Sequence, residues 1–146
     1  MSVQRRHFLG SVVAAPLLRT GAARAQAQQP IRLGVLGDFS GPYRHLSGPT
    51  NVACVRQAVQ DSGLVERGLS VEVLQADHQQ KPDVGLAIAR SWFDRGDVDV
   101  VLEVNNSSIA LAINGLVREK DKVHLNTGAA TAELTGRQCR DRKSVV

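Results

Sequence analysis

A short apolar strand followed at once by a turn-rich segment is encoded at residues 31–43, which read IRLGVLGDFSGPY. Residues 31–37 are mostly aliphatic, as expected of one buried strand, and residues 38–43 hold the Asp, Ser, Gly and Pro that favour turns. Apolar residues then recur at helical spacing over residues 52–59, and Gly63 ends this predicted helix. The pattern therefore predicts one unit of strand, turn and amphipathic helix.

The same unit recurs twice more, and a fourth strand follows the last helix. The further strands are predicted over residues 71–74, 99–104 and 123–125. Pro82 suits the first turn of the second helix, because its missing N–H has no partner there in any helix. The apolar faces of the second and third helices are Val84, Ala87, Ile88, Ser91 and Trp92, and Ile109, Ala112, Ile113, Leu116 and Val117.

Strands that alternate with helices predict the α/β class, a parallel sheet with helices on both faces. In such sheets the loops at the carboxyl ends of the strands meet at one edge, where ligands bind. Short hydroxyls, amides and exposed backbone N–H groups fill these loops, which suits a carboxylate or another small polar group. The four loops are residues 38–43, 77–80, 105–108 and 126–131.

The basic balance of the 146-residue chain comes from its two ends. The chain has 18 Lys and Arg against 14 Asp and Glu, but residues 26–139 hold 11 basic and 13 acidic residues. Aromatic residues make up only 3% of the chain, so few rings are available to stack on bases. Nucleic-acid binding, which depends on clustered Lys and Arg and on stacking, is therefore not expected.

Residues 1–27 have the layout of an export signal. Arg5 and Arg6 form a charged region, residues 8–18 form an apolar run too short to cross a bilayer, and small-x-small cleavage sites end at Ala25 and Ala27. The residues around Arg5 and Arg6 resemble the twin-arginine export motif but depart from it at the first and last positions. We expect a leader cleaved near Ala25 or Ala27 and a periplasmic protein; the alternative is an amphipathic helix of the mature chain.

The last six residues, 141–146, match the in-frame translation of a common sequencing-library adapter, GAT CGG AAG AGC GTC GTG. We therefore expect a non-native tail after Arg140 and a chain that is a fragment of a longer protein. The alternative is a natural basic tail.

Motifs for catalysis, for metal binding and for cofactor binding are missing from the sequence. The glycines do not have dinucleotide-fingerprint spacing, and neither a Gly-Lys-Ser/Thr phosphate loop nor a Gly-x-Ser-x-Gly elbow occurs. Asp77 and His78 are the single acid–imidazole pair of neighbours in the middle of the chain. Consecutive loop residues rarely face one substrate, so a turn that caps the next helix is the better interpretation than catalysis. We expect no enzyme activity, no cofactor and no metal.

The two cysteines and Tyr43 leave alternatives open, whereas two other aromatic residues have one interpretation. Cys54 and Cys139 could form a disulfide in an oxidising compartment, but nothing in the sequence indicates that they are close. Trp92 and its neighbour Phe93 are interpreted as core residues at the end of the second helix. Tyr43 lies in a Gly-Pro turn at the predicted ligand edge, where it is either a wall of the site or a packing residue.

Four segments together resemble the periplasmic solute-binding proteins of ABC importers, of the branched-chain amino-acid type. Besides IRLGVLGDFSGPY, the segments are ADHQQKPDVGLAIAR from Ala76, VNNSSIALAI from Val104 and NTGAATAELTG from Asn126. Members of this family are two-lobed, type I clamshells in which each lobe is a parallel sheet flanked by helices. The resemblance implies that residues 28–140 form most of the first lobe and that the second lobe is missing.

The resemblance also implies which residues bind the ligand. In the family, an aromatic residue after the first strand faces the ligand, which corresponds to Tyr43. A serine after the third strand binds the ligand carboxylate, which corresponds to Ser107 with Asn106 beside it; two asparagines before this serine depart from the family pattern. Backbone groups and a threonine after the fourth strand correspond to Ala129 and Thr131. The acid that binds a ligand ammonium group comes from the second lobe.

The function implied by the resemblance is that of the substrate-binding component of an ABC importer. Such a protein, a monomer without enzyme activity, captures a small polar solute between its lobes and delivers it to a membrane permease. Amino acids, amides and aromatic acids are the candidate solutes. The alternatives are a sensory receptor lobe of the same fold and an exported α/β enzyme.

The fragment hypothesis predicts what the gene encodes after Arg140. Sequencing genomic DNA past this codon should reveal an open reading frame long enough for a second lobe, without codons for residues 141–146. A stop codon directly after Val146 would contradict the hypothesis.

Overall fold

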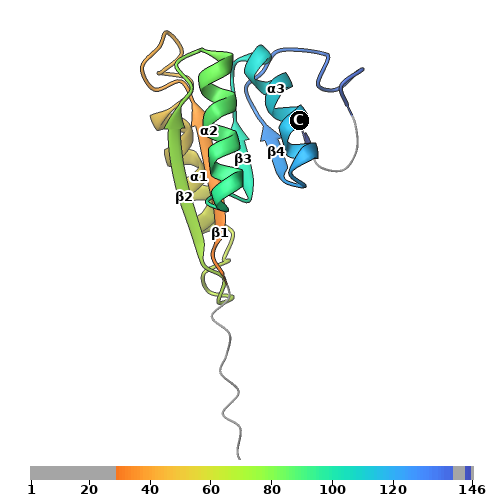
Figure 1. Cartoon of the computed structure of the whole chain (residues 1–146). Helices are drawn as coiled ribbons and strands as arrows, with labels where there is room; N and C mark the ends of the chain where they lie inside the picture. Colours follow the sequence, from red (N-terminus) through yellow and green to blue (C-terminus); the bar gives the residue numbers. More distant parts are fainter. Residues whose placement is uncertain (1–28, 140–143, 146) are drawn as a thin grey trace, which may run out of the picture.

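The structure, a computed structural model, describes residues 29–139 and 144–145. Strands and helices alternate from residue 31 to residue 126 (Figure 1). The elements are β1 (Ile31–Gly37), α1 (Pro49–Asp61), β2 (Val71–Asp77), α2 (Pro82–Arg95), β3 (Val100–Glu103), α3 (Ser107–Glu119), β4 (Val123–Asn126) and β5 (Ser144–Val145).

The predictions for the two ends of the chain fall largely outside the described residues. The leader at 1–27, with Arg5 and Arg6, lies wholly outside them. Of residues 141–146, the described pair 144–145 forms β5, a parallel partner of β4. No helix in residues 29–139 combines the length and the apolar character that crossing a membrane requires.

All the strands are parallel, in the order β2-β1-β3-β4-β5. Leu36 of β1 lies opposite both Ala76 of β2 and Glu103 of β3, and Glu103 in turn lies opposite Asn126 of β4. The carboxyl ends of the first four strands therefore lie at one edge of the sheet. The predicted fold class, an α/β parallel sheet, is confirmed.

The predicted boundaries of β3 and β4 are within one residue of the observed ones at each end, whereas two other elements that lead into this edge differ by more. β2 continues to Asp77 rather than ending at residue 74, because its last residues keep pairing with β1 up to Gly37. α3 begins at Ser107, inside the loop predicted over residues 105–108, because Asn106 caps it: its side-chain oxygen accepts hydrogen bonds from Ser108 N–H and Ile109 N–H. Two residues expected in a loop thus belong to the first turn of a helix.

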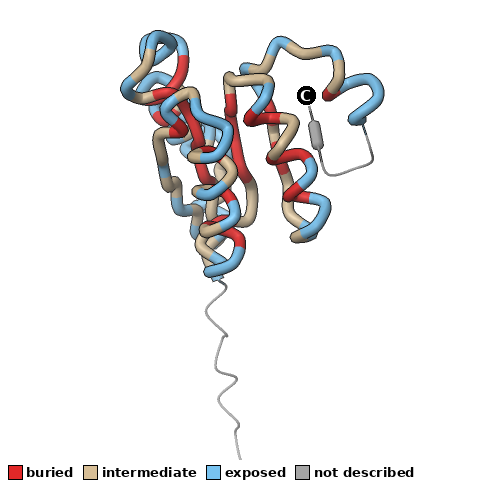
Figure 2. The backbone as a smooth tube through the Cα atoms, turned by 45° about the horizontal axis from the view of Figure 1, so that its top comes forward, coloured by how far each residue is buried: buried red, intermediate tan, exposed pale blue. Residues whose placement is uncertain are grey.

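Two apolar layers hold the helices on opposite faces of the sheet. Val35 and Leu36 are adjacent in β1, so their side chains point to opposite faces. Val35 packs with Val52 of α1, whereas Leu36 belongs to the larger cluster that contains Ile113 of α3 and Trp92 of α2. Figure 2 shows the buried residues along the strands and the inner sides of the helices. Helices therefore cover both faces, as the sequence predicted.

The interpretation of Trp92 and Phe93 as core residues is confirmed, since they are only 7% and 6% exposed. His124 of β4 is also fully buried; burial lowers its pKa to about 4, so its ring is neutral at neutral pH. Cys54 and Cys139 are both exposed and free, so the described structure contains no disulfide between them.

Gly85 allows α2 to pack closely on α3. A Cβ atom at this buried position would lie 2.6 Å from Cγ2 of Ile109, whose side chain is fully buried in the core. Gly115, by contrast, is exposed on α3, and a Cβ atom there would meet nothing within 4 Å. A side chain at Gly85 would therefore clash with the core, whereas a side chain at Gly115 would extend into solvent.

This contrast predicts opposite effects of the same substitution. Gly85→Ala should lower the free energy of unfolding by about 1–3 kcal/mol, because overpacking outweighs the gain in helix propensity. Gly115→Ala should raise it by roughly 0.5–1 kcal/mol, because alanine favours a helix and meets no obstacle. Urea unfolding of the two variants measures both changes, and stabilisation by Gly85→Ala would contradict the close packing.

Candidate functional site

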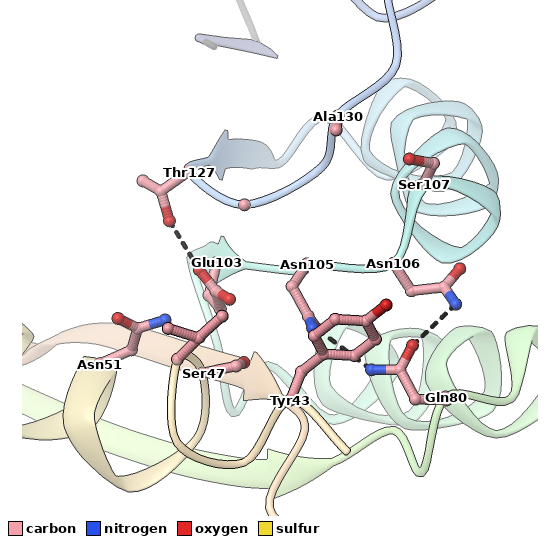
Figure 3. A pocket seen from close by; sticks show the side chains of 12 residues that line it. Tyr43, Ser47, Asn51, Gln80, Glu103, Asn105, Asn106, Ser107, Thr127 and Ala130 are labelled. Carbon is pink, nitrogen blue, oxygen red and sulfur yellow. Dashed lines mark hydrogen bonds between the residues drawn. The ribbon is translucent and has the colours of Figure 1, made fainter. Parts of the chain in front are cut away.

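A polar cavity of about 660 Å³ lies where the carboxyl ends of β1 to β4 meet (Figure 3). This volume lies within the roughly 300–1,000 Å³ common for small-molecule sites. All four predicted edge loops contribute, together with the first turn of α1. The lining residues are Tyr43, Leu46, Ser47, Asn51, Gln80, Glu103, Asn105, Asn106, Ser107, Thr127, Gly128 and Ala130.

Three of the five predicted ligand residues line this cavity: Tyr43, Asn106 and Ser107. Ala129 and Thr131 are not among its lining residues. Ala129 packs against the larger apolar cluster, and its N–H donates a 2.9 Å hydrogen bond to the side chain of Asn126. Thr131 Oγ1 accepts a 3.3 Å hydrogen bond from Glu133 N–H.

Thr127, Gly128 and Ala130 represent the loop after β4 in the cavity instead. Glu103, at the end of β3, lines the cavity and was not predicted. An acidic residue at the end of a strand, two positions before the first of two asparagines, was the sequence signal available.

Asp38 folds the loop that carries Tyr43. Its fully buried carboxyl group accepts hydrogen bonds from Gly41 N–H at 2.6 Å and from Tyr43 N–H at 3.0 Å. Its own N–H donates to Ser47 Oγ at 3.1 Å, which closes the loop from the other side. The Tyr43 ring, half exposed, is thereby placed at the mouth of the cavity.

Gln80 joins three of the loops through its side-chain amide. Nε2 donates to Asp38 Oδ2 at 3.1 Å. Nε2 also donates to Asn105 Oδ1 at 3.4 Å, while Oε1 accepts from Asn106 Nδ2 at 2.9 Å (Figure 3). One amide thus connects the loops after β1, β2 and β3. Because the loops are held before a solute arrives, little conformational entropy remains to be lost on binding.

His78 is fully buried, and its ring contributes to the hydrogen bonds that join the loops. Its Nδ1 accepts a hydrogen bond from Gln80 N–H at 3.1 Å, so its proton is on Nε2, which donates to Asn105 Oδ1 at 2.8 Å. Burial lowers the pKa of His78, although its bond to Asn105 and nearby carboxyl groups oppose the shift. Both ring nitrogens are therefore occupied.

Asp77 also differs from its predicted role. The residue that caps α2 is Lys81, which makes no side-chain cap hydrogen bond, so the expectation that the Asp77–His78 turn caps this helix is wrong. Asp77 instead accepts hydrogen bonds from Phe39 N–H and the Ser40 hydroxyl. Burial alone would raise the pKa of Asp77, but these bonds and one from Gln79 N–H outweigh it and lower the pKa.

The start of α3 presents the hydroxyl group of Ser107 to the cavity. Asn106 satisfies the N–H groups of Ser108 and Ile109, at 3.0 and 3.1 Å. The hydroxyl of Ser107 has no hydrogen-bond partner among the described residues, and Ser107 lines the cavity. A hydroxyl in the first turn of a helix, where the helix dipole is positive, suits a negatively charged ligand group.

The end of β3 has a strained backbone. Glu103 and Val104 have φ angles of 78° and 63°, which non-glycine residues adopt at a cost of about 1–3 kcal/mol each. The buried Asn126 side chain holds this bend, since its Nδ2 donates to the carbonyl oxygens of both residues at 2.9 Å. The bend turns the chain from β3 into the cavity wall, to which Glu103 and residues 105–107 contribute.

An α/β lobe with a polar, preformed cavity at the carboxyl edge of its sheet defines a small-solute binding unit, and the family comparison agrees. Residues 30–142 match the model of the periplasmic binding protein family. The chain belongs to this family.

Two solved structures from Burkholderia resemble the chain in both fold and sequence. The first, a periplasmic binding protein from Burkholderia mallei, is 37% identical with a TM-score of 0.74, and the match covers 80% of this chain and 31% of that one. The second is a branched-chain amino acid ABC transporter periplasmic ligand-binding protein from Burkholderia xenovorans. It is 45% identical with a TM-score of 0.68, over 73% of this chain and 28% of that one.

A curated relative is the Leu/Ile/Val-binding protein homolog 4 of Brucella abortus, 26% identical over 141 residues. That match covers 90% of this chain and 33% of the relative. The chain thus spans about a third of the length of the proteins that it matches.

The loop connections predict that Asn105 supports the site through His78. Asn105→Ala leaves the buried Nε2–H of His78 without its acceptor, which should lower the free energy of unfolding by about 1–3 kcal/mol. Gln57→Ala, which removes an exposed amide on α1, is the matched control and should change it by less than about 0.5 kcal/mol. Equal, small effects in urea unfolding would show that the His78–Asn105 hydrogen bond contributes nothing.

Proposed function

We propose that this protein is the substrate-binding component of an ABC importer, which captures a small polar solute and delivers it to a membrane permease. The observation that carries the proposal is the polar cavity at the carboxyl edge, whose walls come from all four loops and are joined by hydrogen bonds between loops. Membership of the periplasmic binding protein family supports the same role.

The mechanism follows from the open face of the cavity. The described lobe binds one side of the solute through the Tyr43 ring, the Ser107 hydroxyl and neighbouring amides. A second lobe then closes over the other side, so the solute shifts the population toward the closed form by contacts that the open form lacks. The closed form is what the permease recognises. No bond in the solute is made or broken.

The protein works as a single chain outside the cytoplasmic membrane. Export through the leader at 1–27, cleaved near Ala25 or Ala27, brings the protein to the periplasm. There it works as a monomer and without nucleic acid. Among the described residues, no group of three or more His, Cys, Asp or Glu side chains is placed to hold a metal ion.

A binding experiment with a matched pair of serine variants tests this function. The protein expressed from its complete gene is titrated with amino acids, their amides and aromatic acids, and its melting temperature and the fate of each compound are recorded. We expect at least one compound to raise the melting temperature and to be recovered unchanged. At a hundredfold excess over Kd the stabilisation should be about 2.7 kcal/mol.

Ser107→Ala should then weaken binding of a carboxylate by roughly tenfold or more, because a hydrogen bond to a charged group is worth about 1.5–3 kcal/mol. Ser108→Ala, on the exposed neighbour that does not line the cavity, should leave the affinity unchanged. Failure of every compound to bind, or chemical conversion of one that binds, would contradict the proposed function.

A further inference from the structure

The side-chain amide of Asn126 joins two walls of the cavity without lining it. Asn126 is the last residue of β4 and is only 4% exposed. Its Nδ2 donates to the carbonyl oxygens of Glu103 and Val104, and its Oδ1 accepts from Ala129 N–H, each at 2.9 Å. One amide group therefore holds both the segment after β3 and the loop after β4. We call Glu103 and residues 105–107 the β3 wall, and Thr127, Gly128 and Ala130 the β4 wall.

The carbonyl oxygens that Asn126 binds belong to the strained bend at the end of β3. In an extended strand, successive carbonyl groups point to opposite sides, so one side chain does not reach two of them. Glu103 and Val104 depart from extended geometry, with φ angles of 78° and 63°. Val104 is β-branched and fully buried, so this conformation is costly for it. Strained backbone persists only where the surrounding structure maintains it, and it is concentrated at functional sites.

The two walls also contact each other directly. A Cβ atom at Gly128 of the β4 wall would lie 2.9 Å from Cα and 3.0 Å from Cβ of Asn105 in the β3 wall. Asn105 in turn is hydrogen-bonded to His78 and Gln80. A shift of the bend would therefore displace both walls and disturb the hydrogen bonds that join the loops.

We infer that Asn126 is a positioning residue for the solute: its amide group fixes the β3 wall against the β4 wall and so raises the affinity for a molecule that it does not contact. The inference rests on the proposed function and adds a residue to it. A solute that binds groups of both walls, such as Ser107 and Thr127, requires them at a fixed separation. Loops held in place before binding lose little entropy, whereas a site without its supporting residues is too loose to bind well.

Asn126→Asp tests the inference, because it keeps the shape of the side chain and the acceptor for Ala129 N–H but replaces the donor Nδ2 with an oxygen. That oxygen would face two carbonyl oxygens, so the bend should relax. The probes are L-leucine, L-phenylalanine and benzoate, each titrated by calorimetry into the protein expressed from its complete gene, at a temperature at which every variant is folded. Any probe that binds the wild-type protein should bind the variant at least about tenfold more weakly.

A double-mutant cycle distinguishes positioning from a general loss of stability. Ser107→Ala should weaken binding of a carboxylate roughly tenfold in the wild-type protein but less than about threefold when Asn126→Asp is also present, because the hydroxyl group is then no longer held in place. If Asn126→Asp does not fold, Asn126→Ser, whose hydroxyl can donate to only one carbonyl oxygen, takes its place in the titrations and in the cycle.

Val117→Ala is the control for stability. It shortens a fully buried side chain of α3 that belongs to neither wall. The free energy of unfolding should fall because a cavity is created in the core, whereas each affinity should change by less than about twofold.

The possible failures are distinguishable. Unchanged affinity in the Asn126 variant, a full effect of Ser107→Ala in that variant, or an equal loss of affinity in Val117→Ala overturns the inference while the proposed function stands. Binding of none of the three probes, nor of any compound in the wider panel, overturns the proposed function and the inference with it.

Discussion

The buried carboxyl group of Asp38 is the interaction on which the site depends. It accepts hydrogen bonds from the backbone of the loop after β1 and from the Gln80 side chain of the loop after β2. A buried carboxyl group is stable only when its oxygens are satisfied in this way. The loops therefore fold around Asp38. Gln80, which is bonded to Asp38, also makes hydrogen bonds to Asn105 and Asn106 and so fixes the loop after β3. The cavity is a consequence of satisfying buried polar groups where the strands end.

Parallel pairing explains why these groups meet at all. The register aligns the last residues of β1, β2, β3 and β4, so residues far apart in sequence emerge at one edge. The two apolar layers, on opposite faces of the sheet, keep the strands in this register. Strain is concentrated at the end of β3, in Glu103 and Val104, where the chain enters the cavity wall. The two apolar layers hold the strands in place, and the polar residues at the carboxyl edge form the cavity.

Periodicity in the sequence predicted the fold and the location of the site well. Apolar runs and helical spacing gave the order of elements, and the polar composition of the loops predicted the edge at which the cavity lies. Tyr43, Asn106 and Ser107 line it because they lie in the segments that follow the ends of β1 and β3, which a parallel sheet brings to one edge. These successes depend on local pattern and on the rule for parallel sheets.

Features that depend on tertiary hydrogen bonds could not be predicted. The loop after β4 follows a path set by Asn126 and by the Thr127–Glu103 hydrogen bond, so Ala130 lines the cavity whereas Ala129 packs toward the core. Glu103 was expected to be an ordinary strand residue, because no feature of the neighbouring sequence indicates a positive φ angle at a glutamate. The roles of His78 and Gln80 likewise depend on partners 25 or more residues away.

A solute bound at the carboxyl edge of this sheet would lie between loops already joined by hydrogen bonds. Amide hydrogen exchange of the protein expressed from its complete gene, with and without a solute, tests whether it binds there. We expect slower exchange on binding in residues 38–48, 78–81, 104–108 and 127–130. Slower exchange confined to the opposite edge, in residues 62–70, 96–99 and 120–122, would contradict it.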